Sequence, residues 1–385
     1  MIVTLRPVPM TRFLTPPERP LAVRWVVPVD GPPIENAELH WEGDTLVAIE
    51  PTSRPLDRPT DAVLPALVNP HTHLDLSDVA GPVGAGSELP DWLPQIATAR
   101  ASDTRASIDC GLAMCHRFGV GLVADIQGQP VEVTPPAGVD YQPFTELLAS
   151  TTGGWANLEA VVREGVSSGR GLSPHATYSV PLPQLAEVVA LAGNAPVMMH
   201  VAEHAAEREL LEHGTGRFAD MLRSLGVWVD GRYGDSSMTE LLSVLLRAER
   251  PIIAHGNDFS ADDIDQIAEH ENAGVVWCPQ THAFFRQPRH PVAELRAAGV
   301  CVAIGTDSLA SSRTIDPWDD VRHLIRTRPD LSPADVVAMS TRDAARLLDR
   351  PDRGTIAVGM SAPLIAVPLA SPNATDWAMA LFGAR

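Results

Sequence analysis

Histidine and aspartate residues in this sequence have the types and positions of a metal site. His71 and His73 stand two residues apart, and three further residues each end or follow a short apolar run: His200, His255 and Asp307. In an extended segment, residues two apart point to the same side, so His71 and His73 can reach one ion together. Three of these four imidazoles, together with the carboxylate, would suit Zn²⁺ or Fe²⁺ and leave a position for water. The sequence therefore predicts one divalent metal, although His255 taken alone also fits a structural histidine.

Glu203 is a candidate general acid and base beside that metal. It follows His200 by three residues, where a strand should turn into a helix, so its carboxyl can reach a group bound next to the metal. Taken alone, Glu203 also fits an acid in the first turn of a helix, which would complement the helix dipole. We interpret Glu207 and Glu209 in this second way, as solvated acids, and expect His204 to face solvent. The position beside a metal ligand favours a catalytic role for Glu203.

The elements that would position these residues follow from the pattern of the chain after Pro65. Short apolar runs separated by longer helical segments are typical of repeated βα units and a parallel sheet. Gln184–Ala192 and Ala261–His270 are two of the expected helices, and Ser260 would begin the second with a capping box. The expected strands are Ala66–Asn69, Val120–Ile126, Val139–Phe144, Gly171–Pro174, Val197–Met199, Pro251–Ala254, Val275–Cys278 and Val300–Gly305. Eight such units predict a (β/α)8 TIM barrel, an α/β fold in which reactive residues belong at the carboxyl ends of the strands.

The two ends of the chain have a different pattern from its middle. Residues 1–62 are rich in proline and contain short β-like pieces such as Ala22–Val29 and Leu46–Ile49, and β-like sequence returns after Pro351. Because chain termini commonly lie close together, we expect both segments to form one small β-sandwich domain. The predicted organisation is a β domain from residues 1–62 and 351–385, and a metal-dependent barrel from residues 63–350.

The composition excludes several classes of function. All 29 basic residues are arginine, and with 48 acidic residues the net charge is −19. The absence of lysine excludes Schiff-base enzymes, a Walker-type phosphate loop and a carboxylated lysine that bridges two metals. The acidic balance disfavours nucleic acid and membrane surfaces as partners, so we expect a small-molecule substrate. Four scattered cysteines, no apolar run of about 20 residues and no expected signal peptide indicate a cytoplasmic protein, with a homodimer as one assembly left open.

Six stretches of the chain resemble the amidohydrolase superfamily. They lie at the predicted strand ends: Pro65–Ser77, Ser173–His175, His200–Glu203, His255–Asn257, Cys278–Pro279 and Gly305–Ser308. More narrowly, they are similar to the mononuclear branch that contains S-adenosylhomocysteine, guanine and cytosine deaminases and chlorohydrolases. The resemblance implies a single Zn²⁺ or Fe²⁺ with four protein ligands: His71, His73, His200 and Asp307.

The same resemblance implies a hydrolytic deamination. The metal would make water a nucleophile near neutral pH, and Asp307 would accept a proton as this nucleophile attacks C6 of a purine. Glu203 would protonate the ring nitrogen, and His255 would hold the nucleophile in place, so that the tetrahedral carbon expels ammonia. Glu203, His255 and Asp307 are thus the expected catalytic residues of a metal-dependent aminohydrolase.

Two further stretches, His213–Phe218 and Cys278–Phe285, are similar to aminodeoxyfutalosine deaminases of the futalosine route to menaquinone. The implied substrate, 6-aminodeoxyfutalosine, is a purine nucleoside that carries a benzoate, and this anion needs an arginine partner. The expected substrate contacts are His175, His282, Trp92, Arg286 and Arg289. Each has a second interpretation: a loop cap for the two histidines, core packing for the tryptophan and a surface charge for the arginines.

Other functions stay open at the level of the sequence. Deaminases of S-adenosylhomocysteine, methylthioadenosine or guanine, and chlorohydrolases or amidohydrolases of the same branch, would share the metal site. A non-catalytic amidohydrolase-like protein would fit the fold. Because every expected ligand and Glu203 are present, an enzyme is favoured, and its released product would distinguish the enzymatic alternatives.

Overall fold

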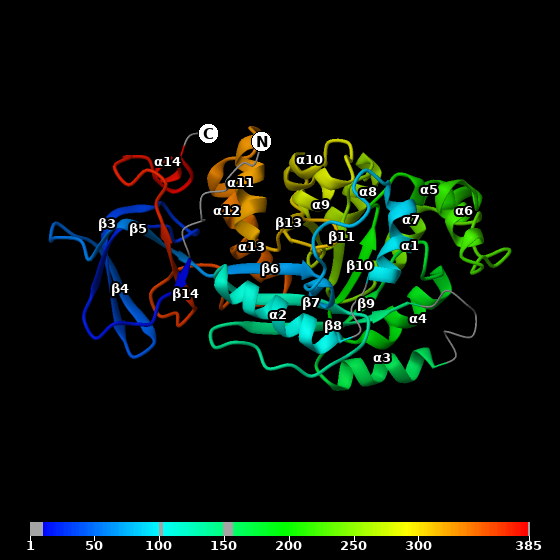
Figure 1. Cartoon of the computed structure of the whole chain (residues 1–385), viewed down its shortest axis with the longest axis horizontal. Coiled ribbons are helices and arrows are strands. Elements are labelled where there is room, and N and C mark those ends of the chain that lie inside the picture. The colour runs from blue at the N-terminus through cyan, green and yellow to red at the C-terminus, as the bar shows by residue number, and fades with distance from the viewer. Residues whose placement is uncertain (1–10, 100–102, 149–156, 384–385) are drawn as a thin grey trace.

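The computed structural model describes residues 11–99, 103–148 and 157–383. Its largest sheet has eight parallel strands in chain order, enclosed by helices (Figure 1). The strands are β6 (Leu67–Thr72), β7 (Val120–Gln127), β8 (Asp140–Leu147), β9 (Gly171–Pro174), β10 (Val197–Val201), β11 (Pro251–His255), β12 (Gly274–Trp277) and β13 (Cys301–Ile304). A parallel bridge between Thr72 and Asp307 joins the end of β6 to the segment after β13 and closes the sheet. The predicted (β/α)8 barrel is confirmed, and each of the eight expected runs overlaps one strand.

Most of the helices follow the strands along the chain and cover the outside of the barrel (Figure 1). They are η1 (Leu74–Leu76), α1 (Leu89–Ala99), α2 (Thr104–Arg117), α3 (Leu158–Ser167), α4 (Leu182–Ala192), α5 (Ala206–His213), α6 (Gly216–Ser224), α7 (Met238–Leu245), α8 (Ala261–Ala268), α9 (Pro279–Phe284), α10 (Val292–Ala297), α11 (Pro317–Thr327), α12 (Pro333–Met339), α13 (Arg342–Leu347) and α14 (Trp377–Phe382). The predicted capping box at Ser260 begins α8, with Asp263 as its partner. Within the described ranges, no helix is both long enough and apolar enough to span a membrane.

Segments from both ends of the described chain form a second sheet beside the barrel (Figure 1). Its strands are β1 (Arg12–Phe13), β2 (Leu21–Val26), β3 (Ile34–Glu42), β4 (Thr45–Pro51), β5 (Arg58–Pro65) and β14 (Leu364–Pro368). Their order is β1-β14-β5-β2-β3-β4, and β14 pairs antiparallel with β5, the strand that leads into β6. Pro363, before β14, has no N–H group, but its carbonyl oxygen accepts from the Ala66 N–H at 2.9 Å. The expected joining of the two terminal segments is confirmed, but they form a single six-stranded sheet, so the prediction of a β-sandwich was wrong.

Apolar side chains fill the interior of the barrel. Leu122, Ala124 and Ile126 alternate along β7 and lie in one buried cluster with Phe144 of β8. Gly171 at the start of β9 makes room for this ring, because a Cβ there would lie 2.3 Å from Phe144 Cδ1. A barrel packed in this way has no pore, so the polar chemistry is confined to the carboxyl ends of the strands.

Candidate active site

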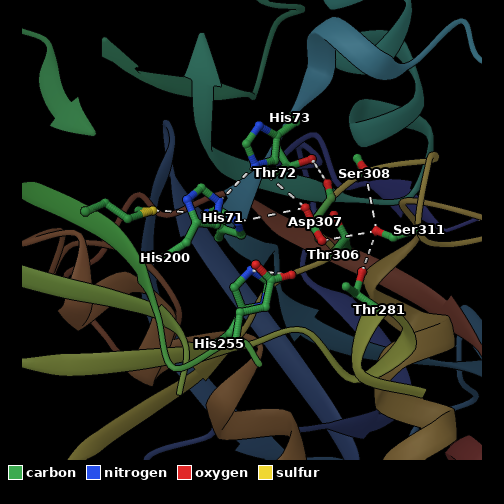
Figure 2. A network of polar contacts seen from close by, with 12 residues as sticks. His71, Thr72, His73, His200, His255, Thr281, Thr306, Asp307, Ser308 and Ser311 are labelled. Atoms are coloured by element: carbon green, nitrogen blue, oxygen red, sulfur yellow. Dashed lines mark hydrogen bonds and ion pairs between the residues drawn. The ribbon is translucent and has the colours of Figure 1, made fainter. Parts of the chain in front are cut away.

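Three imidazoles meet at the carboxyl end of the barrel (Figure 2). His71 and His73 come from the end of β6, and His200 comes from β10; one ring nitrogen of each lies within 4.8 Å of the others. The Nε2 atoms of His73 and His200 are 3.2 Å apart. Asp307 Oδ1 lies 3.9 Å from His71 Nε2 and 3.7 Å from His73 Nε2. The barrel thus brings all four residues predicted as metal ligands to one point.

The protonation of these imidazoles suits metal binding. Burial lowers the pKa of His200 to about 4 and that of His71 well below its usual range, so both rings are neutral near pH 7. His200 Nδ1 lies 2.7 Å from the His175 carbonyl oxygen and donates to it, which leaves the Nε2 lone pair for a metal. His71 Nε2 is buried and has no hydrogen-bond partner among the described residues. This chemistry fits a ligand set for Zn²⁺ or Fe²⁺.

Asp307 is held by the contact that closes the barrel. Its carbonyl oxygen accepts from the His73 N–H at 3.2 Å and from the Thr72 hydroxyl at 2.6 Å. These bonds stabilise a left-handed backbone, with φ 57°, that residues other than glycine rarely adopt. Ser311 Oγ donates to Oδ2 at 3.1 Å, so Oδ1 faces the imidazoles. Burial raises the pKa of Asp307 to about 6, and a bound cation would lower it again.

Glu203 and His255 form the other half of the site. Glu203 lies two residues after β10, His255 ends β11, and Glu203 Oε1 is 3.6 Å from His255 Nε2. Burial raises the pKa of Glu203 well above its usual range, and the charges of Asp307 and Glu207 add to the rise. A carboxyl whose pKa is raised by burial holds its proton more tightly than a solvated acid does, which suits a proton donor. Glu203, His255 and Asp307 also form a second group with metal-ligand spacing.

A pocket beside these groups contains two of the predicted substrate contacts, His175 and Trp92. The Trp92 indole N–H donates to the Val83 carbonyl oxygen at 3.0 Å, and its ring packs edge-on against Phe285 with 5.2 Å between centroids. The rest of the wall is largely apolar and comes from η1 and α1: Leu76, Leu89, Leu93 and Ile96. A polar floor and an apolar wall suit a flat heteroaromatic ring with a less polar substituent.

The structure places the other three expected substrate contacts away from this pocket. Helix α9 begins just after β12 and carries His282 into a separate cavity, where its Nε2 lies 2.7 Å from the Pro288 carbonyl oxygen. Arg289 lines the same cavity and pairs with Glu294, and Arg286 is exposed. Their role in substrate binding stays a prediction, and none of the three lines the pocket that contains His175 and Trp92.

Sequence reasoning missed Glu207, which is fully buried under the site. Its carboxylate accepts from one threonine hydroxyl and from two backbone N–H groups of the turn before α5. The prediction of a solvated acid was therefore wrong for Glu207, whereas Glu209 is exposed as expected. His204, expected to face solvent, has a side chain only 16% exposed. No local sequence signal marks this burial, because Glu203 precedes α5 and the Thr177 donor is 30 residues away along the chain.

Tyr178 and Glu146 also border the site and had no distinctive sequence signal. Tyr178 lines the pocket and stacks on Phe218, with 4.4 Å between ring centroids. Glu146, near the end of β8, places Oε1 4.0 Å from His175 Nε2. Both residues reach the site through the tertiary packing of strands that are distant in sequence from the metal ligands.

Comparison with known proteins decides the family. Residues 62–381 match the family described as the amidohydrolase family. The chain belongs to the amidohydrolase family. The predicted superfamily is confirmed, and with it the prediction that the protein is an enzyme.

This amidohydrolase is similar along most of its length to curated enzymes. It is 30% identical over 339 residues to a 5-methylthioadenosine/S-adenosylhomocysteine deaminase of Halobacterium salinarum. The aligned residues cover 81% of this chain and 74% of that relative. It is 29% identical over 323 residues to an aminodeoxyfutalosine deaminase of Deinococcus radiodurans. Here the aligned residues cover 76% of this chain and 74% of that relative. Among solved structures, an adenosine deaminase from Xanthomonas campestris with bound zinc has a TM-score of 0.70 and 22% identity, covering 95% of this chain and 89% of that one. The structural likeness shows the fold.

Proposed function

We propose that this amidohydrolase is a metal-dependent deaminase of an adenosine-like nucleoside. The observation that carries the proposal is a buried Glu203 carboxyl that shares a pocket with His73, His200 and Asp307, three of the four proposed metal ligands. Hydrolytic removal of an amine from a ring carbon needs an acid for the ring nitrogen opposite an activated water. The names of the two curated relatives, both nucleoside deaminases, support the substrate class.

The metal would be held by the three imidazoles and the carboxylate that meet at the barrel mouth: His71, His73, His200 and Asp307. When bound there, Zn²⁺ or Fe²⁺ supplies the Lewis acidity that makes a water molecule nucleophilic near neutral pH. His175 supports this arrangement without being a ligand, because its carbonyl oxygen fixes the His200 ring through the 2.7 Å contact to Nδ1.

The side chains of the pocket would supply the proton transfers. As the water oxygen bonds to C6 of the purine, Asp307 accepts one water proton and Glu203 donates its proton to N1. His255 Nε2, 3.6 Å from the Glu203 carboxyl, orients the attacking oxygen. Asp307 then passes its proton to the amino group, and the bond from C6 to this nitrogen breaks. Ammonia leaves, and the remaining hydroxyl proton returns to Glu203 as the C6 carbonyl forms.

Two substrates are proposed within this class. 6-Aminodeoxyfutalosine, an intermediate of menaquinone biosynthesis, is the first, on the similarity of His213–Phe218 and Cys278–Phe285 to aminodeoxyfutalosine deaminases. Methylthioadenosine or S-adenosylhomocysteine is the second, because the largely apolar wall that includes Trp92 suits a thioether substituent. The positions of Arg286 and Arg289 outside the pocket also favour the second, since they remove two candidate partners for a benzoate.

The decisive experiment is an ammonia-release screen. Zinc-loaded and iron-loaded protein would be assayed in parallel with 6-aminodeoxyfutalosine, methylthioadenosine, S-adenosylhomocysteine and adenosine. We expect ammonia and the corresponding 6-oxopurine product from at least one of them. The proposal is refuted if neither metal form releases ammonia from any of these nucleosides. Release of chloride or of a carboxylate from other substrates of the branch would instead show a chlorohydrolase or an amidohydrolase.

A further inference from the structure

Glu207 is a buried carboxylate that the proton transfers proposed above do not use. It lies in the first turn of α5, four residues after Glu203, and its side chain is fully buried. Oε2 accepts from Thr177 Oγ1 at 2.8 Å and from the Ala202 N–H at 3.0 Å, and Oε1 accepts from the His204 N–H at 3.0 Å. One carboxylate thus binds the residues on both sides of Glu203 and joins them to the segment after β9.

Two of these contacts differ from those of an ordinary acid at a helix start. The His204 contact, three residues before Glu207, resembles the backward contact of a capping box, whereas the contacts with Ala202, five residues before it, and with Thr177 reach beyond the helix start. Ala202 has φ 52°, a left-handed conformation that its own side chain disfavours and that needs support from outside. The carboxylate of Glu207 supplies this support by holding the turn through its N–H groups.

The turn determines where the Glu203 carboxyl points. Asn257 Nδ2 donates to the Glu203 carbonyl oxygen at 3.0 Å, so this residue is fixed from a second side. The side chain then reaches His255, with 3.6 Å between Oε1 and Nε2. A residue that acts as a proton donor must be held near its substrate, and a shift of about 1 Å can cost a factor of about 100 in rate.

We propose that Glu207 is the positioning residue of Glu203, acting through the 202–204 turn and Thr177. The proposal rests on the proposed function insofar as Glu203 transfers a proton. Glu207 does not contact the substrate, and its effect on turnover passes through Glu203. Glu207→Gln replaces one carboxylate oxygen by an amide NH2 group, which donates hydrogen bonds. This NH2 group would face at least one of the three groups that now donate to Glu207, so that hydrogen bond would be lost.

The kinetic test compares Glu207→Gln in two backgrounds. In the native background we expect kcat to fall about 10- to 100-fold with metal content unchanged and KM changed less than about threefold. In a Glu203→Gln background the same substitution should add a further loss of less than about threefold, because the group that it positions is already gone. Glu212→Gln, an exposed acid on the same helix, is the matched control and should leave kcat unchanged.

A second variant and a crystal structure keep the test independent of stability and of substrate. Thr177→Val removes one donor to Glu207 at nearly constant side-chain volume. Like Glu207→Gln, it should lower kcat in the native background and have little further effect in the Glu203→Gln background. In crystals of Glu207→Gln, the Glu203 carboxyl should have moved away from His255 Nε2. An unmoved carboxyl, a kcat equal to that of the unsubstituted protein, or an equal loss in both backgrounds would overturn the positioning role. If no nucleoside is deaminated, the proposed function fails, and the crystal structure still decides the role of Glu207.

Discussion

Glu203→Gln is the substitution that most directly separates proton transfer from metal binding. The amide keeps the size and planar shape of the carboxyl but cannot release a proton. The Asn257 contact is to the Glu203 carbonyl oxygen and is unaffected by the change. The four ligands at the barrel mouth, His71, His73, His200 and Asp307, are also untouched, so the protein should keep its metal.

The expected size of the effect follows from the burial of this carboxyl. General acid–base catalysis contributes about 10²- to 10⁴-fold to a rate. Because the Glu203 side chain is only 7% exposed, bulk water has little access to replace it, and we expect a loss in the upper part of this range. A loss of about 10³- to 10⁴-fold in kcat corresponds to about 4–5 kcal/mol of transition-state stabilisation.

The assay measures steady-state ammonia release together with the metal content of the same preparations. Glu209→Gln, which changes an exposed acid six residues away, is the control for the chemical change itself. If Glu203→Gln loses its metal, then Glu203 is a ligand in the group with His255 and Asp307, and the proton-donor assignment is refuted. A fall in kcat of less than about tenfold with full metal content would show that another group protonates the ring.

Three further predictions concern the metal, the strand ends and a buried carboxyl. Removal of the metal by a chelator should lower Tm, since an ion at about 1,000 times its Kd adds about 4 kcal/mol to the free energy of unfolding; an unchanged Tm would argue against this site. Gly305→Ala should weaken metal binding and lower Tm, because a Cβ would lie 2.7 Å from Val276 Cγ1 and 3.0 Å from the His71 carbonyl oxygen. Dialysis against a metal buffer measures the affinity for the metal. An affinity equal to that of the unsubstituted protein would show that the added Cβ does not displace the ligands. Burial raises the pKa of Asp125 to about 7, so the folded state binds more protons than the unfolded state between about pH 4 and 7, and stability falls as pH rises. Asp125→Asn should remove up to about 1.4 kcal/mol per pH unit of this slope in denaturant unfolding, and identical slopes would contradict the assignment.

The barrel and the convergence of the proposed metal ligands could be predicted because both follow from local pattern. The expected run Gly171–Pro174 coincides with β9, and the other seven runs overlap their strands, since a parallel strand that is buried on both faces has a nearly continuous apolar run. Once the strands form a closed barrel, their carboxyl ends must meet at one rim. His71, His200 and Asp307 therefore converge as a consequence of topology, even though more than 100 residues separate each from the next.

The surroundings of the metal site were decided only by tertiary structure. His282 was expected at the substrate, but α9 begins directly after β12 and turns its side chain into another cavity. Glu207 was expected in solvent, but the turn before α5 folds over its carboxylate. The direction of a side chain after a strand end depends on which segments pack beside it, and these come from distant parts of the chain, such as Thr177 for Glu207. The sequence by itself determined the barrel and the meeting of the proposed ligands at its rim, because periodicity and strand order suffice for both. The outer contacts required the packed chain, because each depends on neighbours that local sequence does not specify.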